Sequence, residues 1–333
     1  MGRFLLRRAL LAVPILWGAA TLAFLGLHIV PGGIAQAILG QHASAAAIAQ
    51  IRHQLGLDQP LYVQYARFLM SAATGHYGIS FRTHDSVATD IGQALPYTIQ
   101  LSCAALLLAL VLGIPSGAVA AAREGSLVDT ALSSGVLVGV SMPVFWTGLL
   151  LIIAGAAKLG WFPISGALTP GVIVPHVTGM PVVDAALAGD PAALGDAVVH
   201  LALPAIALSL YPLAFIAQMT RAALVEALGE DYVRTARAKG LSARVTVLHH
   251  GLRAALIPVV AVVGLQLGGL LSGAILTETV FAIPGIGWLT VNAILFRDYP
   301  VVEGVVVVTV ALFVLVNLLA DVTYAVVDPR VRY

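Results

Sequence analysis

Long uncharged apolar runs alternate with short polar segments along this chain. Six of these runs reach or approach the roughly 20 apolar residues that a helix needs to cross a bilayer. They are 9–30, 96–122, 130–157, 201–220, 254–277 and 304–320. None of the six contains Asp, Glu, Lys or Arg. The pattern predicts an all-helical, polytopic membrane protein with six transmembrane helices.

A seventh apolar run, 159–183, differs from the other six because it is rich in turn-forming residues. It carries four prolines and four glycines, and a continuous helix would lose backbone hydrogen bonds there that lipid cannot replace. We therefore expect this run to form an external loop, with a re-entrant loop as the alternative.

Composition supports the membrane assignment, and the residues around the first run raise the question of whether it is a span or a signal peptide. The chain is 59% hydrophobic and 10% charged, whereas a soluble domain is about 25% charged. Arg3, Arg7 and Arg8 precede the first run, as in a signal peptide. However, the 22 apolar residues of that run exceed a typical signal core, and no small-x-small cleavage pattern follows. We expect the run to remain as a span. The single cysteine, Cys103, excludes an internal disulfide.

The distribution of charge predicts the orientation. With the N-terminus inside, inner segments hold twelve of the 17 Lys and Arg residues and outer segments hold five, as the positive-inside rule requires. Both termini are then cytoplasmic. Residues 31–95 form an external region and 221–253 a cytoplasmic loop, both parts of one transmembrane domain over 1–333.

The external region contains two predicted helices. Ser44 can cap a helix that runs to about Leu55, and Asp58 with Pro60 opens a second helix that ends near Ala73. The apolar residues of the second helix recur at helical spacing. We expect it to lie against the outer membrane interface; the alternative is a lid packed on the protein's own spans.

Several classes of chemistry lack their residues. The only lysines, Lys158 and Lys239, stand outside any Gly-Lys-Ser/Thr sequence, so the chain has no phosphate-binding Walker loop. Neither His-Glu-x-x-His nor Gly-x-Ser-x-Gly occurs. The uncharged spans also disfavour an ion-coupled carrier, which usually needs intramembrane ionisable groups. We predict no enzymatic activity, no cofactor and an external source of energy; a secondary carrier or channel is the competing class.

A basic segment lies between the fourth and fifth runs: Asp231-Tyr-Val-Arg-Thr-Ala-Arg-Ala-Lys-Gly-Leu241. The sequence 224–239 favours a helix, Gly240 suits a left-handed helix end, and a second helix can start from Leu241. Such a loop can dock a soluble partner. Alternatively, its Arg and Lys residues only obey the positive-inside rule.

These residues resemble the permease subunits of ABC importers in the dipeptide, oligopeptide and nickel class, whose cytoplasmic loop carries the EAA motif. The resemblance covers nearly the whole chain. It rests on Tyr232 to Leu241, His250-Gly-Leu-Arg-Ala-Ala-Leu-Ile-Pro258, Arg7-Arg8 with Pro14, Leu55 to Tyr65, Gly78-Ile-Ser80, Ser141-Met-Pro143, Glu278 to Gly287, Arg297-Asp-Tyr-Pro300 and Asp328-Pro-Arg330. Arg234 stands where the general motif has Glu, as is usual in this class. Pro31-Gly32-Gly33-Ile34 replaces the Pro-Gly-Asp-Pro often found after the first span.

The resemblance implies a type I ABC importer permease of the inner membrane. Its expected partners are a second permease subunit, two cytoplasmic ATP-binding subunits, an external substrate-binding protein and membrane lipid, with no nucleic acid. The expected cargo is a dipeptide or oligopeptide, with nickel or a metal chelate as the alternative. The residues implied at the ATPase contact are Tyr232, Arg234, Ala236, Arg237 and Gly240. Those implied at an external gate are Glu278, Phe281, Pro284 and Gly285, although Glu278 could instead be a helix-end carboxylate in water.

Three further sets of residues have two interpretations each. Polar residues within the spans could line a translocation path or form interhelical hydrogen bonds: Gln100, Gln218, Gln266 and Asn317. Small-residue pairs could build a seam with a second permease or pack within this chain: Gly113/Gly117, Gly135/Gly139, Gly264/Gly268 and Gly269/Gly273. Outer histidines could bind metal, but their spacing favours ordinary solvated side chains: His42, His53, His76 and His84.

Overall fold

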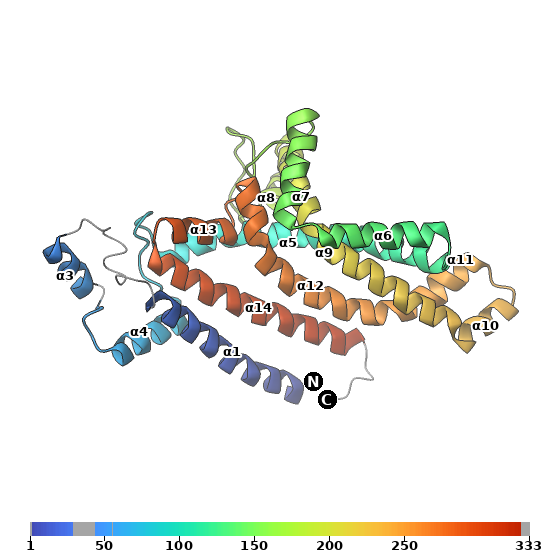
Figure 1. Cartoon of the computed structure of the whole chain (residues 1–333), viewed down its shortest axis with the longest axis horizontal. Helices are drawn as coiled ribbons and strands as arrows, with labels where there is room; N and C mark the ends of the chain where they lie inside the picture. The colour runs from blue at the N-terminus through green and yellow to red at the C-terminus, as the bar shows by residue number, and fades with distance from the viewer. Residues whose placement is uncertain (1, 29–43, 55, 328–333) are drawn as a thin grey trace. The chain divides into compact units, whose positions relative to one another are not determined.

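A computed structural model describes residues 2–28, 44–54 and 56–327, and the described chain is helical throughout, apart from loops and one isolated bridge between Ile79 and Ser86 (Figure 1). The elements, in order, are α1 (Gly2–His28), α3 (Ala45–Gln54), α4 (Leu61–Thr74), α5 (Val87–Ala122), α6 (Leu127–Ser141), α7 (Val144–Leu151), the π-helix η1 (Ile152–Lys158), α8 (Pro181–Ala188), α9 (Pro191–Gly229), α10 (Asp231–Ala238), α11 (Ala243–Val245), the π-helix η2 (Thr246–Gly251), α12 (Leu252–Phe281), α13 (Ile286–Leu295) and α14 (Tyr299–Val327).

The predicted spans correspond to helices in the structure. Within the described residues, four stretches are long and apolar enough to cross a membrane: Val87–Ala122, Pro191–Gly229, Ala243–Leu271 and Tyr299–Thr323. The number rises to six if each of two helix pairs interrupted by a short break counts as one span. The first predicted run lies in α1, whose Leu10–Gly26 stretch is a shorter apolar helix. The chain is therefore an all-helical, multi-pass membrane protein.

The third predicted run is not one straight helix. The chain bends by 102° between Leu127–Ser141 and Val144–Lys158. Met142 is extended, with φ −91° and ψ 126°, because the ring of the following proline disfavours helical geometry at the residue before it. The predicted 130–157 span is therefore a bent pair of helices, and Pro143 is the reason for the break.

The chain folds as two compact units. The first comprises Met1–Pro96 and Pro284–Leu315, and the second comprises Tyr97–Ile283 and Val316–Tyr333. In the first unit, Val87 and Ile91 of α5 pack with Ile286 and Ala293 of α13 and with Val301 of α14. This core brings the beginning of α5 together with α13 and α14, which follow about 200 residues later in the sequence.

Within the first unit, α4 packs on α1. Phe68 is buried against Ala20 and Phe24, the rings of Phe24 and Tyr65 lie 5.2 Å apart, and the Tyr65 hydroxyl is 2.6 Å from Thr21 Oγ1. The structure supports the lid interpretation of this helix. Its predicted bounds are confirmed, as are those of α3, whose Ala47 amide donates to Ser44 Oγ.

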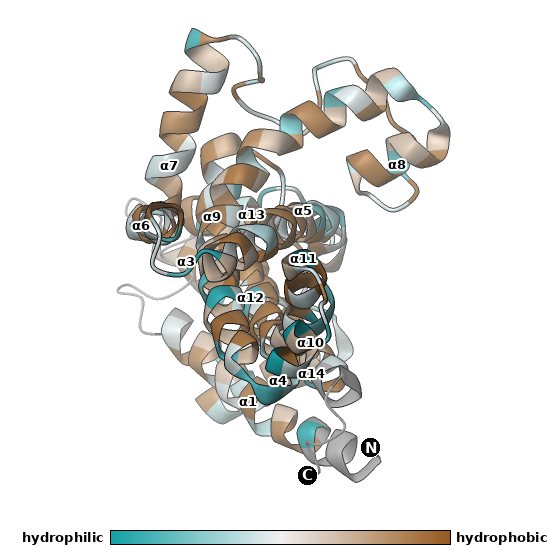
Figure 2. Cartoon of the chain, turned by 90° about the vertical axis from the view of Figure 1, so that its right-hand side faces the viewer, coloured by the Kyte–Doolittle hydropathy of each residue, from teal (hydrophilic) through white to brown (hydrophobic). Residues whose placement is uncertain are grey.

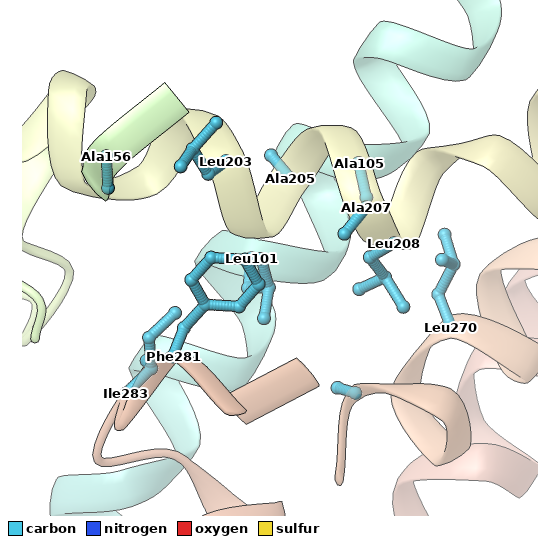
Figure 3. Packing of buried hydrophobic residues seen from close by; sticks show 11 residues of the cluster. Leu101, Ala105, Ala156, Leu203, Ala205, Ala207, Leu208, Leu270, Phe281 and Ile283 are labelled. Carbon is cyan, nitrogen blue, oxygen red and sulfur yellow. The ribbon is translucent and has the colours of Figure 1, made fainter. Parts of the chain in front are cut away.

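The second unit is built around α9, which crosses α5 and α12. Its core contains Leu101 of α5, Leu203 and Leu208 of α9, and Phe281 and Ile283 at the end of α12 (Figure 3). Helices α5 and α9 approach closely because Gly117 has no side chain. A Cβ there would lie 2.4 Å from the Ala217 carbonyl oxygen. The Gly113/Gly117 pair therefore packs within this chain.

Most of the proline-rich run forms no helix, as the sequence predicts: 159–180 is a loop. The last three residues of the predicted loop, 181–183, instead begin α8, with Pro181 in its first turn. Its end is fixed by Asp184, whose carboxylate accepts hydrogen bonds from the Val177, Thr178 and Gly179 amides and from Thr178 Oγ1. Burial opposes ionisation of Asp184, but these hydrogen bonds outweigh it and lower the pKa of the carboxyl group. The loop is thus an ordered part of the fold.

Candidate coupling and gate sites

The basic segment forms a short helix set between breaks in the chain. Helix α9 ends at Gly229, and Glu230 is extended, with φ −71° and ψ 152°. Helix α10 follows, and Gly240 has φ +83°, in the left-handed region that glycine adopts readily. Ser242 then caps α11. The predicted end at Gly240 and the second helix are confirmed. The single helix over 224–239 is wrong, because the extended backbone at Glu230 interrupts it.

Helix α10 has one buried face and one exposed face. Val233 is 0% exposed and Ala236 is 6% exposed. Tyr232 and Arg237 are exposed, and the Arg234 side chain is 73% exposed, close to Asp231 at 3.2 Å. In Figure 2 the hydrophilic colour gathers at α10. The structure places Ala236 on the inner face, where its side chain packs within this chain. The side chains of Tyr232, Arg234 and Arg237 lie on the exposed face.

The inner face of α10 rests on α9 and η2. Behind it, Gly251 packs so closely on α9 that a Cβ would lie 2.7 Å from Leu224 Cδ1 and 3.0 Å from Leu228 Cδ2. Leu224 is buried in a cluster with Ala255 of α12 and with Ala118 and Ala121 of α5. Because packed side chains transmit displacement rather than absorb it, a force on α10 acts directly on the ends of two long helices.

The predicted gate begins in the second unit. Glu278 is 0% exposed and accepts a 2.7 Å hydrogen bond from Thr98 Oγ1, so the alternative of a carboxylate in water is wrong. Phe281 is buried, and its carbonyl oxygen accepts a hydrogen bond from the Gly166 amide. Ala282 ends α12 in a left-handed conformation, with φ +50°. The loop after η1 is thereby bonded to the end of α12.

The other two gate residues lie in the first unit. Pro284 is half-buried, and the buried Gly285 immediately precedes α13, with an extended backbone. The break between α12 and α13 therefore falls at the boundary between the units.

The four polar residues of the spans occupy different environments. The Oε1 atom of Gln100 accepts a 2.9 Å hydrogen bond from the Val182 amide at the start of α8, which supports the hydrogen-bonding interpretation. Gln218 is exposed and borders a hollow between α5, α6 and α9. Gln266 and Asn317 are half-buried. Gln100 and Gln218 border two different hollows.

Two sequence motifs that are far apart meet in the first unit. Asp298 is buried, and its carboxylate accepts hydrogen bonds from Ser80 Oγ (2.6 Å) and from the Phe81 and Arg82 amides (both 3.2 Å). The Arg82 guanidinium also lies 4.4 Å from the centre of the Phe296 ring. Gly78-Ile-Ser80 and Arg297-Asp-Tyr-Pro300 are separate motifs in the sequence. No local pattern in either motif predicts this contact.

The outer histidines do not assemble a metal site in the described residues. Among those residues, no group of three His, Cys, Asp or Glu side chains could hold a metal ion. His53 pairs with Asp58 at 2.9 Å, and this hydrogen bond lowers the pKa of the exposed Asp58 carboxyl group. His42 lies outside the described residues, as do Pro31 to Ile34 and Asp328 to Arg330.

The remaining small-residue pairs divide between internal packing and open faces. A Cβ on Gly264 would lie 2.4 Å from Ala320 Cβ of α14, so this glycine allows close packing within the second unit. Gly135, Gly139 and Gly269 have no other atoms within 4 Å of a Cβ position. The side-chain environment of Gly273 is outside the described part of the chain.

Comparison with known families decides the class. Residues 113–333 match the family described as "Binding-protein-dependent transport system inner membrane component", and residues 1–102 match the N-terminal part of the same kind of membrane component. The chain belongs to this permease family. The resemblance drawn from the EAA-type loop and its companion motifs is thereby confirmed.

Relatives of this permease cover its whole length. It is 42% identical to the dipeptide transport system permease protein DppB of Alkalihalophilus pseudofirmus, over 100% of both chains. It is 44% identical to the di/tripeptide permease protein DppB of Pseudomonas aeruginosa, over 100% of this chain and 99% of the relative. It is 41% identical to DppB of Escherichia coli, with the same coverage.

A solved structure places the fold. The inward-facing MetNI methionine ABC transporter matches with a TM-score of 0.52 and 20% identity, over 70% of this chain and 93% of the other. With the family match, this similarity identifies the type I ABC importer permease fold. The identity is too low to carry substrate or residue roles, so function rests on the full-length relatives and on the sites described above.

Proposed function

We propose that this chain is the permease subunit of an ATP-driven importer of dipeptides and oligopeptides. The observation that carries the proposal is the similarity of 41–44% over the full length to permeases named for dipeptides and di/tripeptides. In this proposal the chain forms half of a translocation path with a second permease. Two cytoplasmic ATP-binding subunits drive it, and an external binding protein delivers the peptide. The permease itself has no catalytic activity.

The geometry of the coupling segment supports this division of labour. Helix α10 offers Tyr232, Arg234 and Arg237 outward while Val233 and Ala236 seat it on α9 and η2. An ATPase that binds the exposed face of α10 and closes on ATP would move α10 together with the parts of α9 and η2 on which it packs. The ends of α9 and α12 would follow, and the path would turn outward. Release of phosphate would let it relax inward.

The proposed orientation places α10 in the cytoplasm and the 159–180 loop and α4 outside. The charge count of twelve inner to five outer Lys and Arg supports this orientation. Glu278, Phe281, Pro284 and Gly285 would then lie near the outer end of the path, where we propose that they close it. The break between α12 and α13 supplies a point at which such a closure can open.

The test is uptake into proteoliposomes that contain this permease, its partner permease and the two ATPases, with ATP inside and the binding protein outside. We expect ATP-dependent uptake of labelled dipeptide that unlabelled di- and oligopeptides reduce and nickel salts do not. Uptake of nickel or a metal chelate without peptide uptake would contradict the proposal. Peptide uptake without ATP would indicate a secondary carrier instead.

A further inference from the structure

A charged pair joins α6 to α9 within the second unit. Asp129, in the first turn of α6, is 5% exposed. Its two carboxylate oxygens accept hydrogen bonds from Arg221 of α9, with Oδ1 2.5 Å from Nε and Oδ2 2.7 Å from Nη2. A two-point contact of this kind fixes the orientation of both side chains as well as their distance. Arg221 therefore makes a specific contact with Asp129, in addition to being one of the basic residues of the proposed cytoplasmic loop.

The carboxylate of Asp129 is held in place by its own turn. It accepts hydrogen bonds from the Gly125 amide at 3.0 Å and from Ser133 Oγ at 3.3 Å. Gly125 has φ +75° in the turn that joins α5 to α6, where a side chain would be strained. Ser126 caps the helix by accepting from the Asp129 amide. The turn thus presents Asp129 to α9 in a preformed geometry.

The pair lies close to the coupling helix along the chain. Arg221 precedes the end of α9 at Gly229 by roughly two helical turns, and α10 follows directly. On the neighbouring face of α9, Gly117 of α5 allows the helices to touch at Ala217 and Thr220. The last part of α9 therefore contacts both α5 and α6, and the chain continues from it into α10.

Arg221 borders a hollow in the second unit. The hollow lies between α5, α6 and α9 and is lined by Ser116, Leu132, Val136, Gln218 and Arg221, among others. The hydrogen bonds between Asp129 and Arg221 join α6 to α9 at the edge of this hollow.

We propose that Asp129 and Arg221 form the joint that makes α6 move with α9 when the coupling helix moves. They are positioning residues, because they act through α9. The inference rests on the proposed function, since it assigns this pair a part in the same transport cycle. To orient the chain in the membrane, Arg221 would need only its positive charge. The two-point contact with the Asp129 carboxylate is not needed for that purpose.

The first test uses Asp129→Asn, Arg221→Gln and the double variant, with Arg123→Gln as the matched control. Arg123 is an exposed basic residue in the same turn. In the assembled complex with binding protein, we expect basal ATPase activity to stay near the wild-type value. Peptide-stimulated ATPase activity and uptake should both fall about tenfold, the scale of a typical coupling free energy. The double variant should lose no more than either single variant, because both remove one interaction. The control should behave as wild type.

Two outcomes would overturn the proposal. One is full peptide stimulation in both single variants. The other is a loss that only follows the amount of assembled complex, which would make the pair merely structural. Arg221→Lys keeps the charge but not the two-point contact. If the neutral variants fail to assemble, partial uncoupling in Arg221→Lys is expected, and wild-type coupling there would equally overturn the proposal.

A second measurement does not depend on the cargo. Spin labels at Leu127 of α6 and Glu226 of α9, both exposed, report whether the two helices move together when the ATPases bind ATP. We expect one narrow distance distribution in the wild type and a broadened, ATP-dependent one in Asp129→Asn. Identical distributions would overturn the joint. Absent peptide stimulation in the wild type would instead contradict the proposed function and leave this readout intact.

Discussion

Replacing Asp298 tests whether the contact between two distant motifs holds the outer unit together. In the wild type its buried carboxylate accepts hydrogen bonds from Ser80 Oγ and from the Phe81 and Arg82 amides. Asp298→Ala would leave all three donors without this acceptor. Ser80 is itself buried, so its hydroxyl gains no compensating water there. The loss should loosen the 80–83 turn from the start of α14.

The magnitude follows from the three bonds. A hydrogen bond to a charged group contributes about 1.5–3 kcal/mol, and a donor left unsatisfied in the interior costs about 1–3 kcal/mol. The two amide donors are only partly buried, so water recovers part of their loss. We expect a net destabilisation of about 3 kcal/mol for Asp298→Ala, since the contributions are not additive.

Amide hydrogen exchange at Phe81 and Arg82, in detergent or nanodiscs, measures this loss directly. A destabilisation of about 3 kcal/mol corresponds to exchange faster by roughly a hundredfold. Asp85→Asn is the matched control, because it changes an exposed carboxylate in the same turn. Exchange rates in Asp298→Ala within a factor of two of the control would refute the reasoning.

Three further predictions concern the coupling helix, the topology and the outer loop. Gly240→Ala places a side chain in the left-handed region at a cost of about 1–2 kcal/mol, whereas Gly240→Asn is better tolerated there. Peptide-stimulated ATPase activity should therefore fall more in the alanine variant, and equal losses would indicate bulk at a partner contact instead. Single cysteines at Gly171 and Ser242, in a variant without the native cysteine, should react with an impermeant thiol reagent from opposite sides of the membrane, with Gly171 outside. Labelling of both from one side would contradict the orientation. Hydrogen bonds lower the pKa of Asp184, so its stabilising effect is present above the ordinary value of 3.8 and is lost as the pH falls through the lowered value. Pepsin cleavage of the 159–180 loop should rise on acidification in the wild type, and it should already be high and insensitive to pH in Asp184→Asn.

Hydrophobic runs predict the helical class because lipid leaves the backbone no other way to satisfy its hydrogen bonds. The same argument identifies 159–180 as a loop. The hydrophobic pattern does not locate the bend at Met142, because the apolar residues continue through the break. The signal that could have located it is Pro143. The hydrophobic pattern also misses the extended conformation of Glu230, since the local sequence favours a helix on both sides and tertiary packing decides.

The candidate sites show a similar division. The exposed residues of α10 follow from its helical period, and the buried position of Ala236 follows from the same period once the inner face is known. The contacts of Asp298 with Ser80 and of Glu278 with Thr98 join residues about 200 positions apart. No local pattern specifies such pairs. In the sequence, a buried acid such as Asp298 or Glu278 is only a charged residue next to an apolar run, and its burial is not apparent.

Cross-linking along α10 tests the central claim most directly, which is that its exposed face meets the ATPase while its inner face stays seated on the permease. In a Cys103→Ala background, single cysteines replace Tyr232, Thr235, Val233 or Ala236 in the assembled complex. A short thiol-to-amine reagent should join the first two to the ATP-binding subunit, in a manner that nucleotide changes. The buried pair should give no such product. Equal products from both faces, or none from Tyr232→Cys and Thr235→Cys, would contradict the account.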